Sequence, residues 1–136
     1  MAVTMDAFYE GELHCVLTHG LSGSTIATDA PADNRGKGAA FSPTDLVGAA
    51  LGSCALTTMA LRAAERGWAI EGATAHVTKE MESTPRRHIA KLTVEFVLPN
   101  GLDDEARAFL EHTARTCPVE ASLGNPTRVE MIFRYA

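Results

Sequence analysis

The chain has 136 residues, a formal net charge of −5 at pH 7, 46% hydrophobic residues and 21% charged residues. This balance is ordinary for a globular protein, and the length fits one domain, so we expect a single domain over residues 1–136. Nucleic acids and acidic membranes bind concentrated Lys/Arg faces, and the chain has no such run of positive charge. We therefore expect neither a nucleic-acid nor a membrane partner.

Three cysteines, Cys15, Cys54 and Cys117, are spread along the chain. The odd number and the lack of a signal-peptide pattern at the N-terminus favour a soluble protein of the reducing cytoplasm. No CxxC pair or phosphate-binding glycine loop is present. Only His14-Cys15 with His19 comes close to ligand spacing, and on a strand His14 and Cys15 face opposite ways, so we expect no metal and no cofactor. The longest apolar run, residues 46–61, is interrupted by small polar residues and is short for a membrane span.

In chain order, residues 3–30 are expected to form β structure. Alternating apolar and polar residues over 12–19 indicate a strand, the turn-forming stretch 20–23 follows, and residues 24–28 can return as a paired strand. Residues 29–41 are rich in Pro, Gly, Asn and Asp and are expected to form a loop.

A long helix then follows. Ser42 is a suitable N-cap, Pro43 suits the first helical position, and Asp45 stands where a capping box has its acid. The pattern predicts a helix to about Arg66, ended by Gly67. It is apolar nearly all round, which is typical of a helix buried on all sides, and its many small residues would let other backbones come close. So small a domain can hardly cover it, and a second subunit is the natural cover.

Two strands are expected next, over residues 73–82 and 87–98, then a second helix from near Asp103 that Pro118 interrupts, and a last strand over 127–135. The order of strands, helix, strands, helix and strand indicates an α+β fold with a mostly antiparallel sheet.

Two of the cysteines are open to two interpretations each. Cys54, in the middle of the long helix, could pack as a small hydrophobe, or it could be a thiolate if an electropositive setting lies nearby. Cys117 precedes Pro118 and would be the N-cap of a short helix, where the helix dipole lowers a thiol pKa, although Cys-Pro also occurs by chance. Cys15, on the apolar face of its strand, is expected to pack in the core.

Two charged residues are further candidates. Arg35 is either a solvated cation of the glycine-containing loop or part of a site, and Asp45 is explained by the capping box alone. These residues do not by themselves name a reaction.

Two motifs do point to a family. Residues 42–54, SPTDLVGAALGSC, resemble the helix signature of the OsmC/Ohr family, and Cys117-Pro118-Val119 followed by Ser122-Leu123 is similar to that family's second-cysteine motif. Both motifs in the right order are far more specific than either alone, and the resemblance covers nearly the whole chain.

The resemblance implies an OsmC-like fold in an intertwined homodimer, with the long helices buried centrally. It implies a cysteine-based peroxidase that reduces organic (alkyl or lipid) hydroperoxides, in which Cys54 becomes a sulfenic acid and Cys117 resolves it as a disulfide. A dithiol such as a dihydrolipoyl group would be the reductant. The family also uses an Arg and an acidic residue beside the thiol. Arg35, in the loop before the helix, resembles the cation of the OsmC branch, and the resemblance implies that Asp45 is the acid.

The chain departs from the Ohr branch at two places. The early hairpin turn, residues 20–23, holds no Arg, and the Ohr acid would fall on Thr44. The alternative function is that of a non-catalytic stress-response protein, or of one that binds a thiol or acyl ligand. A purely structural dimer would leave the Cys-Pro motif unexplained.

Overall fold

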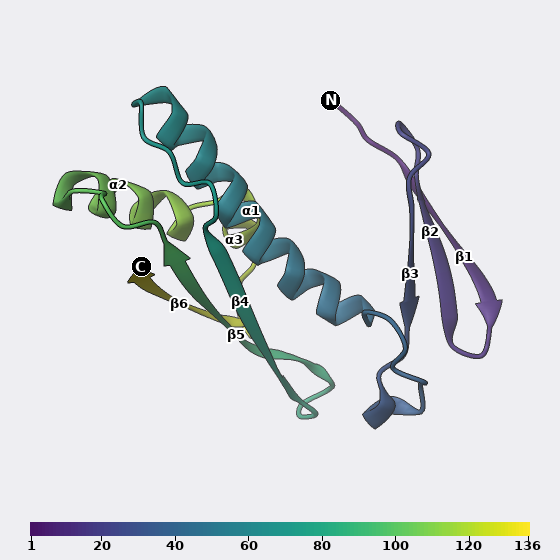
Figure 1. Cartoon of the computed structure of the whole chain (residues 1–136). Coiled ribbons are helices and arrows are strands. Elements are labelled where there is room, and N and C mark those ends of the chain that lie inside the picture. Colours follow the sequence, from purple (N-terminus) through teal and green to yellow (C-terminus); the bar gives the residue numbers. More distant parts are fainter. The chain divides into compact units, whose positions relative to one another are not determined.

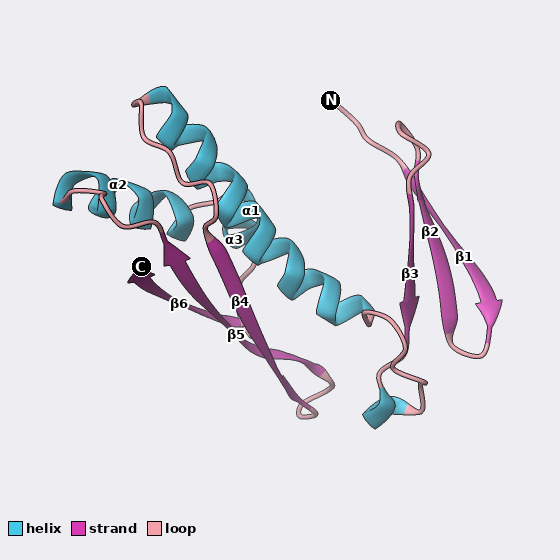
Figure 2. Ribbon diagram, in the orientation of Figure 1, coloured by secondary structure: helices cyan, strands magenta, loops and turns pink.

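The computed structural model describes all 136 residues and has a mixed α+β architecture (Figures 1 and 2). The elements are β1 (Met5–Gly11), β2 (His14–His19), β3 (Thr25–Asp29), the short 3-10 helix η1 (Ala32–Asn34), α1 (Pro43–Glu65), β4 (Thr74–Glu82), β5 (His88–Leu98), α2 (Asp104–Arg115), α3 (Pro118–Ser122) and β6 (Arg128–Tyr135). They form two compact units, Met1–Val47 and Gly48–Ala136. The expectation that these make one domain stays a prediction.

The first unit is an antiparallel meander in the order β1-β2-β3. It has no buried apolar side chain: all the buried hydrophobic residues of the chain lie from Leu51 to Cys117, in the second unit. Most of the large exposed hydrophobic residues are in this unit: Met1, Val3, Met5, Phe8, Tyr9, Leu13, Leu21, Ile26 and Phe41. Three strands with one uncovered apolar surface need packing partners to be stable.

The second unit holds the hydrophobic core. Its sheet has the order β4-β5-β6, with β4 and β5 antiparallel and β5 and β6 parallel, so the predicted antiparallel arrangement has one parallel exception. The central strand β5 buries alternate side chains completely, from Leu92 to Leu98, and the ring of Phe96 stacks on Phe133 with 5.0 Å between centroids. Leu110 of α2 is also fully buried.

Helix α1 approaches β4 and β5 closely through two glycines. A Cβ at Gly48 would lie 3.3 Å from side-chain atoms of Val77 and Leu92, and one at Gly52 would lie 3.0 Å from Val77. The predicted role of small residues in close packing is thus confirmed for this face of the helix.

Only one face of α1 is buried within the chain, as expected for a helix that so small a domain can hardly cover, and burial of its other faces by a second subunit stays a prediction. The buried residues are Gly48, Leu51, Gly52, Ala55, Met59 and Ala63. The exposed residues of its middle and end include Ala50, Ser53, Thr57, Ala60, Leu61 and Ala64.

With its 23 residues α1 is long and apolar enough to cross a membrane by length and composition alone. Core helices of soluble proteins pass the same test, so its length and composition are weak evidence for a membrane span.

Candidate active site: two cysteines of the second unit

Cys54 lies in the middle of α1 and is half-buried, so its thiol is partly open to solvent. Its Sγ is 3.9 Å from Oγ1 of Thr58, one turn further along the helix. The Thr58 hydroxyl donates its proton to the Cys54 carbonyl, at 2.7 Å. Toward the Cys54 sulfur this hydroxyl can therefore only accept.

Cys117 stands at the junction of α2 and α3. The chain leaves α2 at Thr116, and Cys117 is the N-cap of α3 with extended backbone angles (φ −67°, ψ 156°) and Pro118 in the first helical turn. The sequence prediction of this N-cap position is confirmed. The Cys117 side chain has no exposed surface.

Cys54 and Cys117 are both free thiols, and they lie near enough for Cys54 to affect the pKa of Cys117. Burial raises the pKa of the Cys117 thiol, and the hydrogen bond and charge of Cys54 raise it further. The backbone N–H groups of Glu120 and Val119 oppose this rise but do not outweigh it. The expectation that the helix start would lower the pKa of Cys117 is therefore wrong, because desolvation of the thiolate dominates over the first-turn N–H groups.

A hollow of about 280 Å³ lies between α1 and α2, and it is lined by Thr58, Arg62, Phe109, His112, Thr113 and Thr116. Thr58 connects it to the Cys54 sulfur. The Arg62 guanidinium lies 5.5 Å from the centre of the Phe109 ring, and its Nε is 3.2 Å from Glu65. Sequence reasoning missed Thr58 and Arg62, although their places four and eight residues after Cys54 put them on its side of the helix.

Asp45 makes the predicted capping box at the start of α1. Its Oδ2 accepts a hydrogen bond from the N–H of Ser42 at 2.9 Å, and its own N–H donates to the Ser42 hydroxyl at 3.1 Å. One carboxylate oxygen is thus committed to the helix start. The function that the resemblance implies for Asp45 stays a prediction.

Arg35 lies in the first unit, at the C-cap of η1, and its side chain is exposed. Cys15, on β2 of the same unit, is half-buried, so it is not part of the core that we expected. Of the predicted residues, the structure therefore brings Cys54 and Cys117 together within one unit.

The family model for the OsmC-like protein family matches residues 36–132, which include both cysteine motifs. The chain belongs to this family. A candidate osmotic stress induced and detoxification response protein from Psychrobacter arcticus 273-4 is 37% identical, with a TM-score of 0.92 over 98% of this chain and 97% of that one.

Two more distant OsmC-like structures share the fold. One is OsmC of Legionella pneumophila, an organic hydroperoxide resistance protein (18% identity, TM-score 0.75, 98% and 97% of the two chains covered). The other is an organic hydroperoxide resistance protein from Elizabethkingia anophelis (13% identity, TM-score 0.80, 100% and 97% covered). No curated protein matches the chain.

Proposed function

We propose that this OsmC-like protein is a thiol-dependent peroxidase that reduces organic hydroperoxides to alcohols. The observation that carries the proposal is the proximity of one half-buried thiol, Cys54, to one fully buried thiol, Cys117, whose pKa it helps to raise. A substrate can reach only the accessible thiol, so Cys54 is the nucleophile. The buried partner stays protonated at neutral pH because its pKa is raised, which suits a resolving cysteine.

The Cys54 thiolate attacks the outer oxygen of the hydroperoxide, the O–O bond breaks, and the alkoxide takes a proton to leave as the alcohol. Cys54 is then a sulfenic acid. The Cys117 sulfur displaces its hydroxyl, so a disulfide and one water are formed. An external dithiol, such as a dihydrolipoyl group, returns both cysteines to thiols and is itself oxidised to a disulfide.

Arg35 completes the proposed site as the cation that stabilises the Cys54 thiolate and the developing alkoxide, with Asp45 as the acid that orients it. A guanidinium is suited to this because it stays charged and offers several fixed donors. If Arg35 proves irrelevant, Arg62 is the second candidate cation, because it lines the hollow that reaches Cys54 through Thr58.

We further propose that the protein works as an intertwined cytoplasmic homodimer. Two observations support a partner copy: the first unit has no buried apolar residue, and one face of α1 is exposed, including Leu61. Small domains rarely leave so many large apolar side chains uncovered. Sedimentation equilibrium tests the proposal, and a monomer at micromolar concentration would refute it.

The test of the peroxidase proposal is peptide mapping of the reduced protein after one equivalent of cumene hydroperoxide. The expected product is a Cys54–Cys117 disulfide with Cys15 still a thiol. Steady-state consumption with a lipoyl dithiol as donor should then follow. A major disulfide that contains Cys15, or recovery of all three thiols, would refute the proposal. Recovery of the thiols would favour a non-catalytic stress-response role or one in binding a thiol or acyl ligand.

A further inference from the structure

The loop that carries Arg35, residues 30–41, is closed at its base by β3 and the β1–β2 turn. The N–H of Asp29 donates to the Phe41 carbonyl at 3.0 Å, and the N–H of Ala30 donates to the Leu13 carbonyl at 3.0 Å. The ends of the loop are thus joined to each other and to the neighbouring hairpin. All of these residues belong to the first unit.

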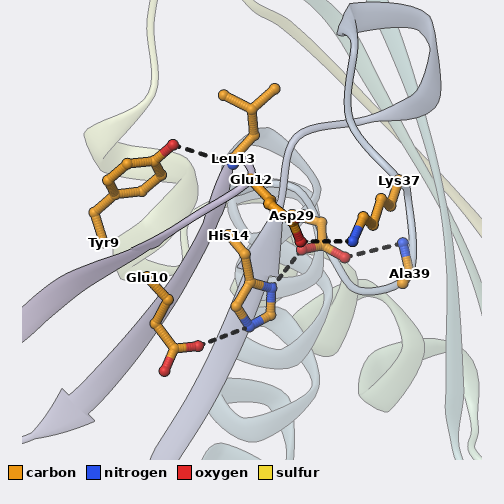
Figure 3. A network of polar contacts seen from close by, with 8 residues as sticks. All are labelled: Tyr9, Glu10, Glu12, Leu13, His14, Asp29, Lys37 and Ala39. Carbon is orange, nitrogen blue, oxygen red and sulfur yellow. Dashed lines mark hydrogen bonds and ion pairs between the residues drawn. The ribbon is translucent and has the colours of Figure 1, made fainter.

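The Asp29 carboxylate ties the two sides of the loop together (Figure 3). Asp29 is 5% exposed, and its Oδ2 accepts a hydrogen bond from the N–H of Ala39 at 3.1 Å. Its Oδ1 lies 2.5 Å from Nδ1 of His14, the residue directly opposite in the β2–β3 pairing. This contact is the main reason that the pKa of Asp29 is lowered, so the carboxylate is charged at neutral pH. Nε2 of His14 faces Glu10 at 3.5 Å.

A second tie reaches the loop from the β1–β2 turn. Nζ of Lys37 donates to Oε2 of Glu12 at 2.8 Å, two residues after Arg35 (Figure 3). The pair is exposed, with 67% and 78% of the two side chains accessible, and such a pair contributes little free energy by itself. Its effect is geometric, because it fixes the direction in which the chain leaves Arg35.

The backbone of Arg35 itself is in the left-handed region, with φ 69° and ψ 5°. This conformation is unfavourable for a residue with a side chain, and it persists only where the surroundings enforce it. The next residue, Gly36, is pressed against the chain: a Cβ there would lie 1.6 Å from the Ala30 carbonyl oxygen. The loop therefore holds a strained arginine directly before a crowded glycine and an anchored lysine.

From this arrangement we infer that Asp29, held by His14, and the Lys37–Glu12 pair are positioning residues that fix the conformation of the loop around Arg35. The inference rests on the proposed function, in which Arg35 is the cation of the site. A solvated loop cation needs neither a buried carboxylate anchor nor a strained backbone, whereas a cation that must meet a small developing charge needs both. Displacement of a reacting group by about 1 Å can cost about a hundredfold in rate.

The experiment is a double-variant comparison of the second-order rate constant for oxidation of Cys54 by cumene hydroperoxide. Asp29→Asn and Lys37→Met are each made alone and together with Arg35→Ala. Asp29→Asn should lower the rate constant about tenfold in the native background and less than twofold in the Arg35→Ala background, because misplacing an absent cation changes nothing. Lys37→Met should follow the same pattern with a smaller loss, and Lys37→Arg should restore the rate.

Lys91→Met is the matched control, since Lys91 pairs with Glu130 at 2.7 Å in the second unit and should leave the rate unchanged. Equal losses from Asp29→Asn in both backgrounds, or none in either, would overturn the inference. Amide hydrogen exchange gives a readout that needs no activity: Ala39 and Gly38 should exchange faster in Asp29→Asn, and unchanged protection would also overturn it. Failure of the proposed function would be seen separately in Cys54→Ser, which changes no residue of the loop. If that variant still consumed cumene hydroperoxide, the proposed function would fail whatever the loop variants showed.

Discussion

Serine substitution of each cysteine separates their proposed roles. Reduced Cys117→Ser should consume a first equivalent of organic hydroperoxide as fast as the native protein, and then slowly a second equivalent as the unresolved sulfenic acid is oxidised to sulfinic acid. The native protein without a dithiol should stop after one equivalent. Cys54→Ser should show no consumption, because its hydroxyl is not a nucleophile at neutral pH without an activating base.

The stability cost of Cys117→Ser can be worked from its surroundings. The side chain has no exposed surface, so an unpaired hydroxyl there would cost about 1–3 kcal/mol. Serine is also among the best N-caps, worth about 0.5–2 kcal/mol, and the N–H groups of Val119 and Glu120 lie at this helix start. The two effects nearly cancel. A net loss of about 1 kcal/mol leaves a domain of ordinary stability folded.

The assay is single-turnover consumption of cumene hydroperoxide, with intact-mass spectrometry to count oxygen atoms added to each variant. Circular dichroism must first show that every variant is folded. Cys15→Ser is the control and should behave like the native protein. A normal first equivalent in folded Cys54→Ser, or its loss from both variants alike, would refute the assignment of nucleophile and resolving thiol.

Three further predictions follow from the packing and the charges. Gly52→Val should destabilise the protein by about 1–3 kcal/mol in urea unfolding, because even a Cβ at Gly52 would lie 3.0 Å from Val77. The control, Ala108→Val on the exposed face of α2, should cost less than about 1 kcal/mol. Cys117 should be alkylated by iodoacetamide more slowly than a free thiol, and only at higher pH, because its pKa is raised. Because the pKa of Asp29 is lowered, its contribution to stability is complete above the ordinary value of 3.8 and is lost as the pH falls through the pKa in the folded protein. In Asp29→Asn the free energy of unfolding should therefore depend less on pH in the acid range.

The local pattern was sufficient to predict the elements. The predicted helix from Ser42 to about Arg66 is α1, which runs to Glu65, because capping and termination depend on neighbours in the sequence. The strands 73–82 and 87–98 are β4 and β5 within one residue at each end. The N-cap position of Cys117 was predicted for the same reason, since Pro118 fixes the first turn.

Features that depend on distant contacts were not predictable in this way. Nothing local to Cys117 reveals that it is fully buried, and that burial reverses the expected direction of its pKa shift. The pairing of His14 with Asp29, 15 positions apart in the chain, depends on strand register, and the segment between them carries no signal of it. The proximity of the two thiols, across 63 positions, was implied by the family resemblance and not by spacing.

The thiol pair and the loop of Arg35 belong to different units and are held by separate sets of interactions. The thiol pair depends on α1, α2 and α3, whereas the loop of Arg35 depends on β2, β3 and the β1–β2 turn. A change in the loop should therefore alter reactivity toward peroxide without altering the thiol pair. Asp29→Asn should form the Cys54–Cys117 disulfide with the small oxidant diamide at the native rate, while its oxidation by cumene hydroperoxide slows. Slower reaction with both oxidants would mean that Asp29 acts through the overall fold, and its assignment as a positioning residue would fail.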